Sequence, residues 1–173
     1  MKASEDERRH TITVLVDNEP GVLARVIGLF SGRGYNIDSL TVAEVDKARG
    51  LSRINIVTTG TELVIEQIKS LLAKLVPVHK VQDLTVLGPH VERELALVKV
   101  TGDRERLIAA LRIADFMHAR LVDSTPGSLV FEATGTPDEL DALIELVQPV
   151  EVSRAGIVAI GRGDIVLEAR PAA

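Results

Sequence analysis

The stretch that decides the fold of this chain is Asp17-Asn18-Glu19-Pro20-Gly21-Val22-Leu23-Ala24-Arg25-Val26. It joins an apolar strand pattern to an amphipathic helix pattern through a turn. Asn18 suits a tight turn, Pro20 has the φ of a first helical residue, and Gly21 has no side chain to hold a ligand away. The first N–H groups of the helix would then meet an anionic small molecule, with the positive end of the helix dipole behind them. An ordinary strand–helix turn has the same local chemistry.

The residues around this turn predict six elements in the order βαββαβ. Ile12, Val14 and Val16 alternate with other side chains, which is typical of a strand. Apolar residues then recur at helical spacing, and glycine is available at position 34 for a left-handed helix end. The predicted elements are strands over 10–16, 35–45, 51–58 and 78–87, and helices over 21–33 and 61–75.

The second half of the chain repeats this order. Thr59-Gly60-Thr61 and Thr134-Gly135-Thr136 occupy the same strand-to-helix junction, and Pro77 and Pro149 the same helix-to-strand junction. Strands are predicted over 95–100, 119–123 and 129–134, and helices after the cap Asp103 and over 138–147. Coincidence between two α+β halves is the alternative to a true repeat. We expect a disordered tip (1–9), a first domain (10–87), a linker (88–94), a second domain (95–164) and a flexible tail (165–173).

The fold class predicted is α+β, with two tandem βαββαβ ferredoxin-like domains. Right-handed crossovers give the strand order 4-1-3-2, so the run 35–45 becomes an edge with unpaired backbone groups. Such an edge predicts a dimer through a continuous sheet, unless the second half of the chain covers it. Asn18 and Asn36 would lie roughly 20 Å apart within one chain. A two-fold dimer would bring Asn18 of one chain to Asn36 of the other, beside apolar Val22, Leu23 and Ile37.

Composition and charge exclude several classes of function. The net charge of −5 and pI of about 5.4 leave no basic stripe for nucleic acid. The chain has no cysteine, and its four histidines have no ligand spacing, so a metal site is not expected. No apolar run is long enough to span a bilayer, and the charged N-terminus does not resemble a signal peptide. We therefore expect a cytoplasmic protein with no cofactor, nucleic acid or membrane partner of its own.

A family resemblance covers the chain from about residue 10 to 164. Residues 17–25 resemble the start of an ACT domain, an amino-acid-sensing module. The stretch 25–42, Arg-Val-Ile-Gly-Leu-Phe-Ser-Gly-Arg-Gly-Tyr-Asn-Ile-Asp-Ser-Leu-Thr-Val, resembles the small regulatory subunit of acetolactate synthase, also called acetohydroxyacid synthase. Further matching segments follow in order at 51–54, 67–68, 74–76, 91–100, 151–156 and 161–163.

The resemblance implies a non-catalytic subunit of branched-chain amino acid biosynthesis. Members of the family bind a larger catalytic subunit that carries thiamine diphosphate, Mg²⁺ and FAD. They raise its activity and confer feedback inhibition by valine, often also by leucine or isoleucine. The effector lies between two ACT domains. By matching motif, its contacts are Asn18, Gly21, Val22 and Leu23 of one chain and Asn36 and Ile37 of the other, with Pro20 a neighbour that varies among bacterial relatives.

Two other classes of function stay open at this stage. A freestanding tandem ACT sensor could regulate transcription or another enzyme, although no basic helix is visible. A small enzyme would need a nucleophile–base pair or cofactor loop that the sequence lacks. The acids Asp138, Glu139 and Asp141 are expected to be solvated at a helix start. Residues 161–164 are expected to form a flexible tail, with contact to the catalytic subunit as the functional alternative. The second repeat lacks the Asn-Glu-Pro-Gly turn, so we expect it to assist partner contact.

Overall fold

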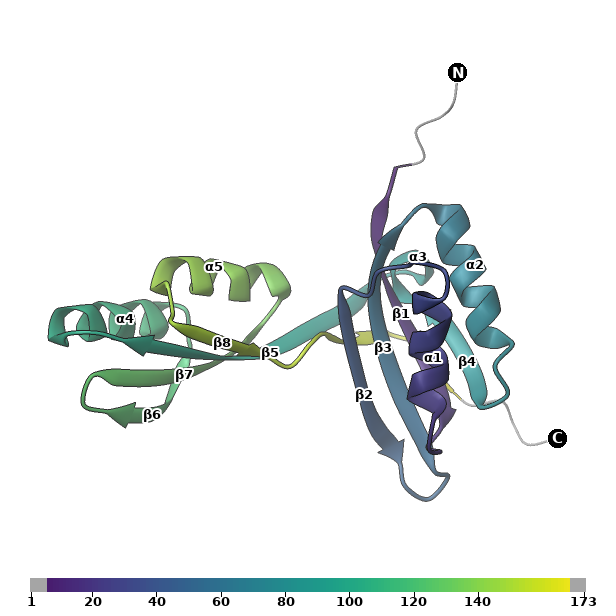
Figure 1. The fold of residues 1–173 in the computed structure, drawn as a ribbon, viewed down its shortest axis with the longest axis horizontal. Coiled ribbons are helices and arrows are strands. Elements are labelled where there is room, and N and C mark those ends of the chain that lie inside the picture. The colour runs from purple at the N-terminus through teal and green to yellow at the C-terminus, as the bar shows by residue number, and fades with distance from the viewer. Residues whose placement is uncertain (1–5, 169–173) are drawn as a thin grey trace. The chain divides into compact units, whose positions relative to one another are not determined.

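The computed structural model describes residues 6–168 and divides them into two compact units. The first unit consists of residues 6–91 together with 158–168, and the second is Glu92–Ile157. The second unit is therefore inserted in the chain before the first is complete. Each unit is described by itself below (Figure 1).

The first unit is a four-stranded antiparallel sheet with two helices on one face (Figure 1). Its sheet has the order β2-β3-β1-β4, which confirms the predicted 4-1-3-2 order and leaves β2 at an edge. The pairing of β1 with β3 runs from Arg8 opposite Gly60 to Asp17 opposite Leu51. The elements are β1 (Arg8–Asp17), α1 (Val22–Ser31), β2 (Ser39–Asp46), β3 (Leu51–Gly60), α2 (Glu62–Ala73) and β4 (Val78–Asp83).

The core of this unit lies between the sheet and the two helices. Alternate residues of β1 and β3 point to that side, where they meet the apolar stripes of α1 and α2. Tyr35 and Ile37, from the connection after α1, pack against the same core. The buried cluster comprises Ile12, Val14, Val16, Val22, Val26, Leu29, Phe30, Ile54, Ile56, Ile65, Ile68 and Leu72.

Several predicted boundaries in the first half are wrong. The helix predicted over 21–33 is α1, Val22–Ser31, because Gly21 is its N-cap in a left-handed conformation. The second strand begins at Ser39, so residues 32–38 form a connection held by side-chain bonds to β3.

The predicted strand 78–87 ends at Asp83, whose carboxylate caps a short helix, α3 (Leu84–Leu87). The prediction of a disordered tip over 1–9 is wrong for Arg8 and Arg9, which begin β1, while residues 1–5 lie outside the described part.

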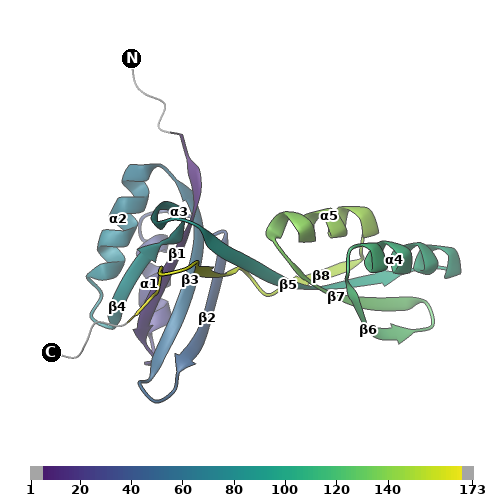
Figure 2. The same cartoon turned by 180° about the vertical axis from the view of Figure 1, so that it is seen from behind.

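The other face of the first sheet is covered by α3 and by the segment that follows the second unit. Leu15 and Val57 point to this face by strand alternation and are buried. Figure 2 shows β9 (Val158–Gly161) crossing this face. Arg53 on β3 donates from Nη2 to the carbonyl of Ala159 at 2.7 Å. The expectation of a free tail from residue 161 is wrong, because Gly161 is in β9 and Arg162 N donates to Pro89 O.

The second unit confirms the repeat, with the sheet order β6-β7-β5-β8 and two helices on one face (Figure 1). Strand β5 begins at His90, inside the stretch expected to be a linker, and β9 pairs with β5 outside the main path of the sheet. Thr61 caps α2 and Thr136 caps α5 at equivalent junctions. The elements are β5 (His90–Thr101), α4 (Arg104–Phe116), β6 (Arg120–Thr125), β7 (Ser128–Gly135), α5 (Pro137–Val147) and β8 (Glu151–Arg154).

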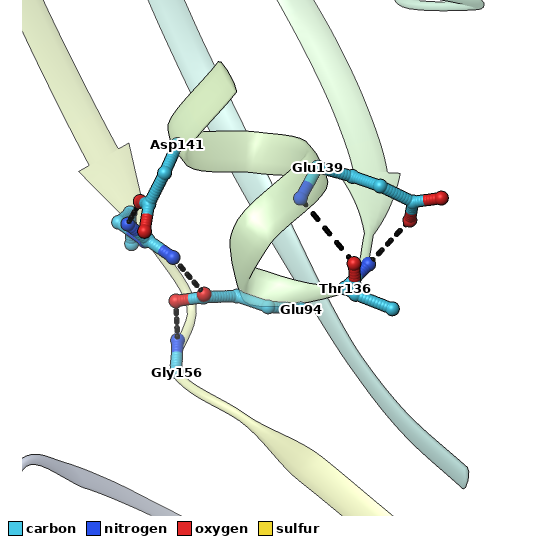
Figure 3. Close-up of polar contacts among 6 residues, drawn as sticks. Glu94, Thr136, Glu139, Asp141 and Gly156 are labelled. Carbon is cyan, nitrogen blue, oxygen red and sulfur yellow. Dashed lines mark hydrogen bonds and ion pairs between the residues drawn. The ribbon is translucent and has the colours of Figure 1, made fainter. Parts of the chain in front are cut away.

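The acids at the start of α5, Asp138, Glu139 and Asp141, are exposed as expected, but Glu139 and Asp141 also form hydrogen bonds. Glu139 and Thr136 form a reciprocal capping box (Figure 3). The guanidinium of Arg154 donates to the carboxylate of Asp141 and also to that of Glu94, which lies on β5. Glu94 Oε1 in turn accepts from the N–H of Gly156 at 3.2 Å. This network ties β5, β8 and α5 together in the second unit.

In the described residues 6–168, helices long and apolar enough to cross a membrane are absent.

Candidate functional site

The turn between β1 and α1 leaves the start of the helix open. Gly21 is the N-cap with φ 85°, a left-handed conformation that favours glycine. Pro20 therefore lies in the turn outside the helix and not at the first helical position, contrary to prediction. Within residues 6–168, the N–H groups of Leu23 and Ala24 have no acceptor, since Gly21 has no side chain to cap them. By helix geometry, these two donors point out of the N-terminal end of α1.

The other long helices are capped in the usual way. The side chains of Thr61, Asp103 and Thr136 accept from the third N–H of α2, α4 and α5 respectively. A capping side chain satisfies donors that would otherwise attract an anion. The start of α1 is therefore the helix start in the described chain that best suits an external acceptor.

Asn18 is exposed and lies against the hairpin between β2 and β3. Its N–H donates to the carbonyl of Gly50 at 2.7 Å, and its Nδ2 donates to Glu44 Oε1 at 3.1 Å. The preceding residue, Asp17, accepts from His79 Nε2 at 2.6 Å and donates its N–H to Pro77 O. The turn is thus fixed to three neighbouring segments, while the Asn18 side chain stays at the surface.

Asn36 and Ile37 lie at the opposite end of the sheet from Asn18. Thr58 Oγ1, near the end of β3, donates to the carbonyl of Asn36 at 2.6 Å. The Asn18 N–H donates to the carbonyl of Gly50, which directly precedes the start of β3. The two positions are therefore separated by about 20 Å along the strand. One chain does not bring the two halves of the predicted site together. The Asn36 amide is exposed and donates to Asp38 Oδ1 at 2.6 Å.

The predicted apolar contacts are not equally accessible. Val22 is in the core and is only 4% exposed, so its side chain does not face the turn. Leu23 and Ile37 are half-buried at the margin of the core and keep part of their surface open. Among the residues predicted for one chain, Asn18, Pro20 and Gly21 are exposed around the free helix start.

Sequence reasoning missed Glu44 as a neighbour of Asn18. Glu44 is two residues before the end of β2 and opposite Ser52 of β3, at the hairpin end of the sheet. The predicted strands 35–45 and 51–58 contained the signal, because a carboxylate just before the turn that joins them lies beside the end of β1. Groups of three or more His, Asp or Glu that could hold a metal ion do not occur in residues 6–168.

Comparison with known families assigns both units. Residues 12–80 match the family described as the AHAS small subunit-like ACT domain, and residues 93–163 match the family described as the small subunit of acetolactate synthase. The "Acetolactate synthase small subunit" of Aquifex aeolicus is 45% identical over 159 residues, which cover 90% of this chain and 82% of that protein. This chain belongs to the acetolactate synthase small subunit family.

Other members of the acetolactate synthase small subunit family match over almost their whole length. The "Acetolactate synthase isozyme 3 small subunit" of Salmonella typhimurium is 44% identical, with 92% of this chain and 99% of that protein covered. The crystal structure of the small subunit from Thermotoga maritima is 37% identical and superposes with a TM-score of 0.81, covering 91% of this chain and 99% of that one. These matches confirm the predicted family and the α+β, ACT-like fold.

Proposed function

We propose that this chain is the regulatory subunit of acetolactate synthase, which activates a catalytic large subunit and makes it sensitive to valine or another branched-chain amino acid. The observation that carries the sensing role is the uncapped start of α1 beside exposed Asn18. Two free N–H groups and the helix dipole suit the carboxylate of an amino acid. Because the chain belongs to the acetolactate synthase small subunit family, we propose that the sensing controls acetolactate synthase.

The effector pocket is proposed to form between two chains. Asn18, Pro20, Gly21, Val22 and Leu23 would come from one chain and Asn36 and Ile37 from its partner. The geometry of one chain supports this, because the two groups lie at opposite ends of β3. Val22 would contribute its backbone, since its side chain is in the core.

The surface proposed for dimerisation is the edge strand β2. Among the described residues, β2 pairs with β3 alone, and Val42 on β2 is 47% exposed. An antiparallel partner strand would satisfy the backbone groups along this edge and form a continuous sheet. The same two-fold arrangement would carry Asn36 of the partner to the Asn18 end.

Glu44 refines the proposed binding mode. Its carboxylate bonds to Asn18 Nδ2 at 3.1 Å on the exposed side of the turn. An amino acid whose carboxylate lay at the Leu23 and Ala24 N–H groups would carry its ammonium group toward this acid. A charge-assisted bond of that kind is stronger than a neutral one.

The chemistry of the holoenzyme is proposed to reside on the partner. Thiamine diphosphate, Mg²⁺ and FAD would be bound by the large subunit, and this chain would carry no catalytic residue and no cofactor. The proposed compartment is the cytoplasm. Neither nucleic acid nor a membrane is proposed as a partner, in keeping with the net charge of −5.

The test is acetolactate formation by the large subunit of the same organism, measured with and without this chain and over a range of valine concentrations. We expect this chain alone to be inactive, to raise the rate of the large subunit, and to make that rate fall as valine increases. Equal rates with and without the chain would overturn the proposal. Activation without any response to valine, leucine or isoleucine would overturn its sensing part.

A further inference from the structure

The second unit contains an open pocket, whereas the equivalent space in the first unit is filled by residues of the first unit itself. The α4–α5 pocket has a volume of about 270 Å³ and lies between the end of α4, the end of β7 and the first turns of α5. Its floor is apolar and comprises Met117, Ala133, Leu140 and Leu143. This space is many times the roughly 30 Å³ that one water molecule occupies in the liquid.

The internal repeat explains why the pocket exists. Residues 32–38 connect α1 to β2 in the first unit, whereas only residues 117–119 connect α4 to β6 in the second. The shorter connection is tight enough to hold His118 in a left-handed conformation with φ 57°. This three-residue connection is too short to cover the end of β7.

In the first unit the longer connection occupies the equivalent place. Thr58 Oγ1, at the end of β3, donates to Asn36 O, and Tyr35 Oη donates to Gln67 on α2 at 2.9 Å. Tyr35 and Ile37 pack against the core there. The position equivalent to Gln67 is Ala142, counted from the matching junctions at Gly60 and Gly135. In the first unit, the space equivalent to the pocket is therefore filled by an aromatic side chain, Tyr35, and an aliphatic one, Ile37.

The rim of the pocket carries an unusual exposed aromatic residue. Phe116, the last residue of α4, lines the pocket and is 79% exposed. Exposed aromatic residues beside apolar pockets are typical of the anchoring points of protein interfaces.

We propose that the α4–α5 pocket receives an aromatic side chain of the acetolactate synthase large subunit, with Phe116 packed against it. The proposal rests on the proposed regulatory function. It makes the second unit a docking module for the catalytic subunit, while the first unit keeps the effector turn.

The chemistry of the pocket favours a side chain over a free amino acid. Among the described residues that line it, none is lysine or arginine, and Glu139 presents a carboxylate. The bond from the Thr136 N–H lowers the pKa of Glu139, so this carboxylate is ionised at neutral pH. An amino acid carboxylate would be repelled there, whereas an uncharged ring would meet no such repulsion and could pack on the apolar part of the lining.

A second copy of this chain has no aromatic side chain to spare. The chain has three Phe, one Tyr and no Trp. Phe30 and Phe131 are buried in the two cores, and Tyr35 is bonded to Gln67. Phe116 lines its own pocket. A second copy could therefore offer only Phe116, which would have to leave its own rim, and this favours an aromatic residue of a different protein as the occupant.

The test measures two quantities. The first is the concentration of this chain that half-activates the large subunit, and the second is the direct binding of this chain to the large subunit, measured by sedimentation. Phe116→Ala removes the rim, and Thr134→Tyr, at an exposed position of the lining, fills the pocket with a ring from the chain itself. We expect each variant to raise the half-activating concentration about tenfold or more. The matched control is Leu146→Ala on α5, a 57% exposed apolar residue that does not line the pocket, and it should behave as the wild type.

Valine binding to each variant alone, measured by calorimetry, should equal that of the wild type, which shows that the variants are folded and separates docking from sensing. Wild-type half-activating concentrations for both pocket variants would overturn the proposal while leaving the regulatory function intact. Loss of self-association in Phe116→Ala would also overturn it, in favour of a second copy as the occupant. A wild-type chain that neither binds nor stimulates the large subunit would overturn the regulatory function itself.

Discussion

Arg154 bridges Glu94 and Asp141, but the two carboxylates differ in exposure. Both pairs have N···O distances of 2.5 Å. The Glu94 side chain is 5% exposed and the Asp141 side chain 62%. These bonds raise the pKa of Arg154, so its charge is present over the whole working range of pH. The buried pair carries most of the energetic consequence, because the exposed pair is screened by water.

Arg154→Met should therefore destabilise the second unit by about 3 kcal/mol, since it leaves the Glu94 carboxylate buried with only the Gly156 N–H. Urea unfolding followed by circular dichroism measures the change. Asp141→Asn is the matched control, because it removes only the exposed pair and should cost under about 1 kcal/mol. Equal losses in the two variants would contradict the assignment of the buried pair as the dominant one.

Glu139 should give α5 a pH-dependent contribution to stability. Its pKa is lowered in the folded chain, mainly by the bond from the Thr136 N–H and then by the Thr136 side chain. A lowered folded pKa gives stability that is present above the ordinary value of 4.5 and is lost as pH falls through the folded pKa. Glu139→Gln should be less stable than the wild type at about pH 7 and similar to it at about pH 3.

Asp138→Asn is the control for this pH dependence, because it removes a charge from the same helical turn without touching the capping box. Its unfolding free energy should change less at neutral pH than that of Glu139→Gln. A gap between wild type and Glu139→Gln that stays constant down to about pH 3 would refute the explanation.

Gly21→Asp should remove feedback inhibition while leaving activation of the large subunit largely intact. A Cβ at Gly21 meets no atom within 4 Å, so the side chain fits, and its charge would repel the effector carboxylate. Losing one charge-assisted bond costs about 1.5–3 kcal/mol, so the half-inhibiting valine concentration should rise about ten- to hundredfold. Gly21→Asn matches it in size and left-handed strain. If both variants lost inhibition equally, charge would not be the cause.

The shared pocket can be tested by subunit mixing. Gly21→Asp and Asn36→Ala should each weaken valine binding in dimers of a single variant. A mixed dimer has one pocket with both changes and one with neither, so calorimetry on the mixture should recover valine binding. Absence of recovery, with subunit exchange confirmed, would mean that each pocket lies within one chain.

Truncation and internal excision should differ in their effect on the first unit. A chain ending at Pro89 loses the Ala159 carbonyl that accepts from Arg53 and the Ile165 side chain beside Gly88. It should unfold at a lower temperature than a chain in which a Gly-Ser linker replaces residues 92–157. Scanning calorimetry compares the two, and equal midpoints would show that the segment after residue 157 adds nothing to the first unit.

The architecture could be predicted because its signals are local and repeated. Alternation in β1, the helical stripe of α1 and the paired junctions at Thr61 and Thr136 each depend on neighbouring residues. The errors arose where tertiary contacts decide. The run after Phe30 is extended in sequence pattern, but bonds from Thr58 and Thr59 hold residues 36–38 as a connection. Strand β9 and α3 depend on a sheet face that no local pattern reveals.

The candidate site was predictable in part. The turn motif located Asn18 and Gly21, since asparagine and glycine at such a turn have specific backbone roles. The burial of Val22 and the bond from Asn18 to Glu44 depend on how α1 and the β2–β3 hairpin pack. The α4–α5 pocket required a comparison of two folded units, because it results from the shorter connection after Phe116.

The insertion of Glu92–Ile157 within the first unit has a consequence for synthesis. A nascent chain emerges from its N-terminus, and domains generally fold as they emerge. Here the second unit can fold before β9 has left the ribosome, whereas the sheet face of Leu15 and Val57 lacks its final cover until then. The unit that carries the β1–α1 turn is thus begun first and completed last, and a nascent chain stalled before residue 158 would hold it unfinished.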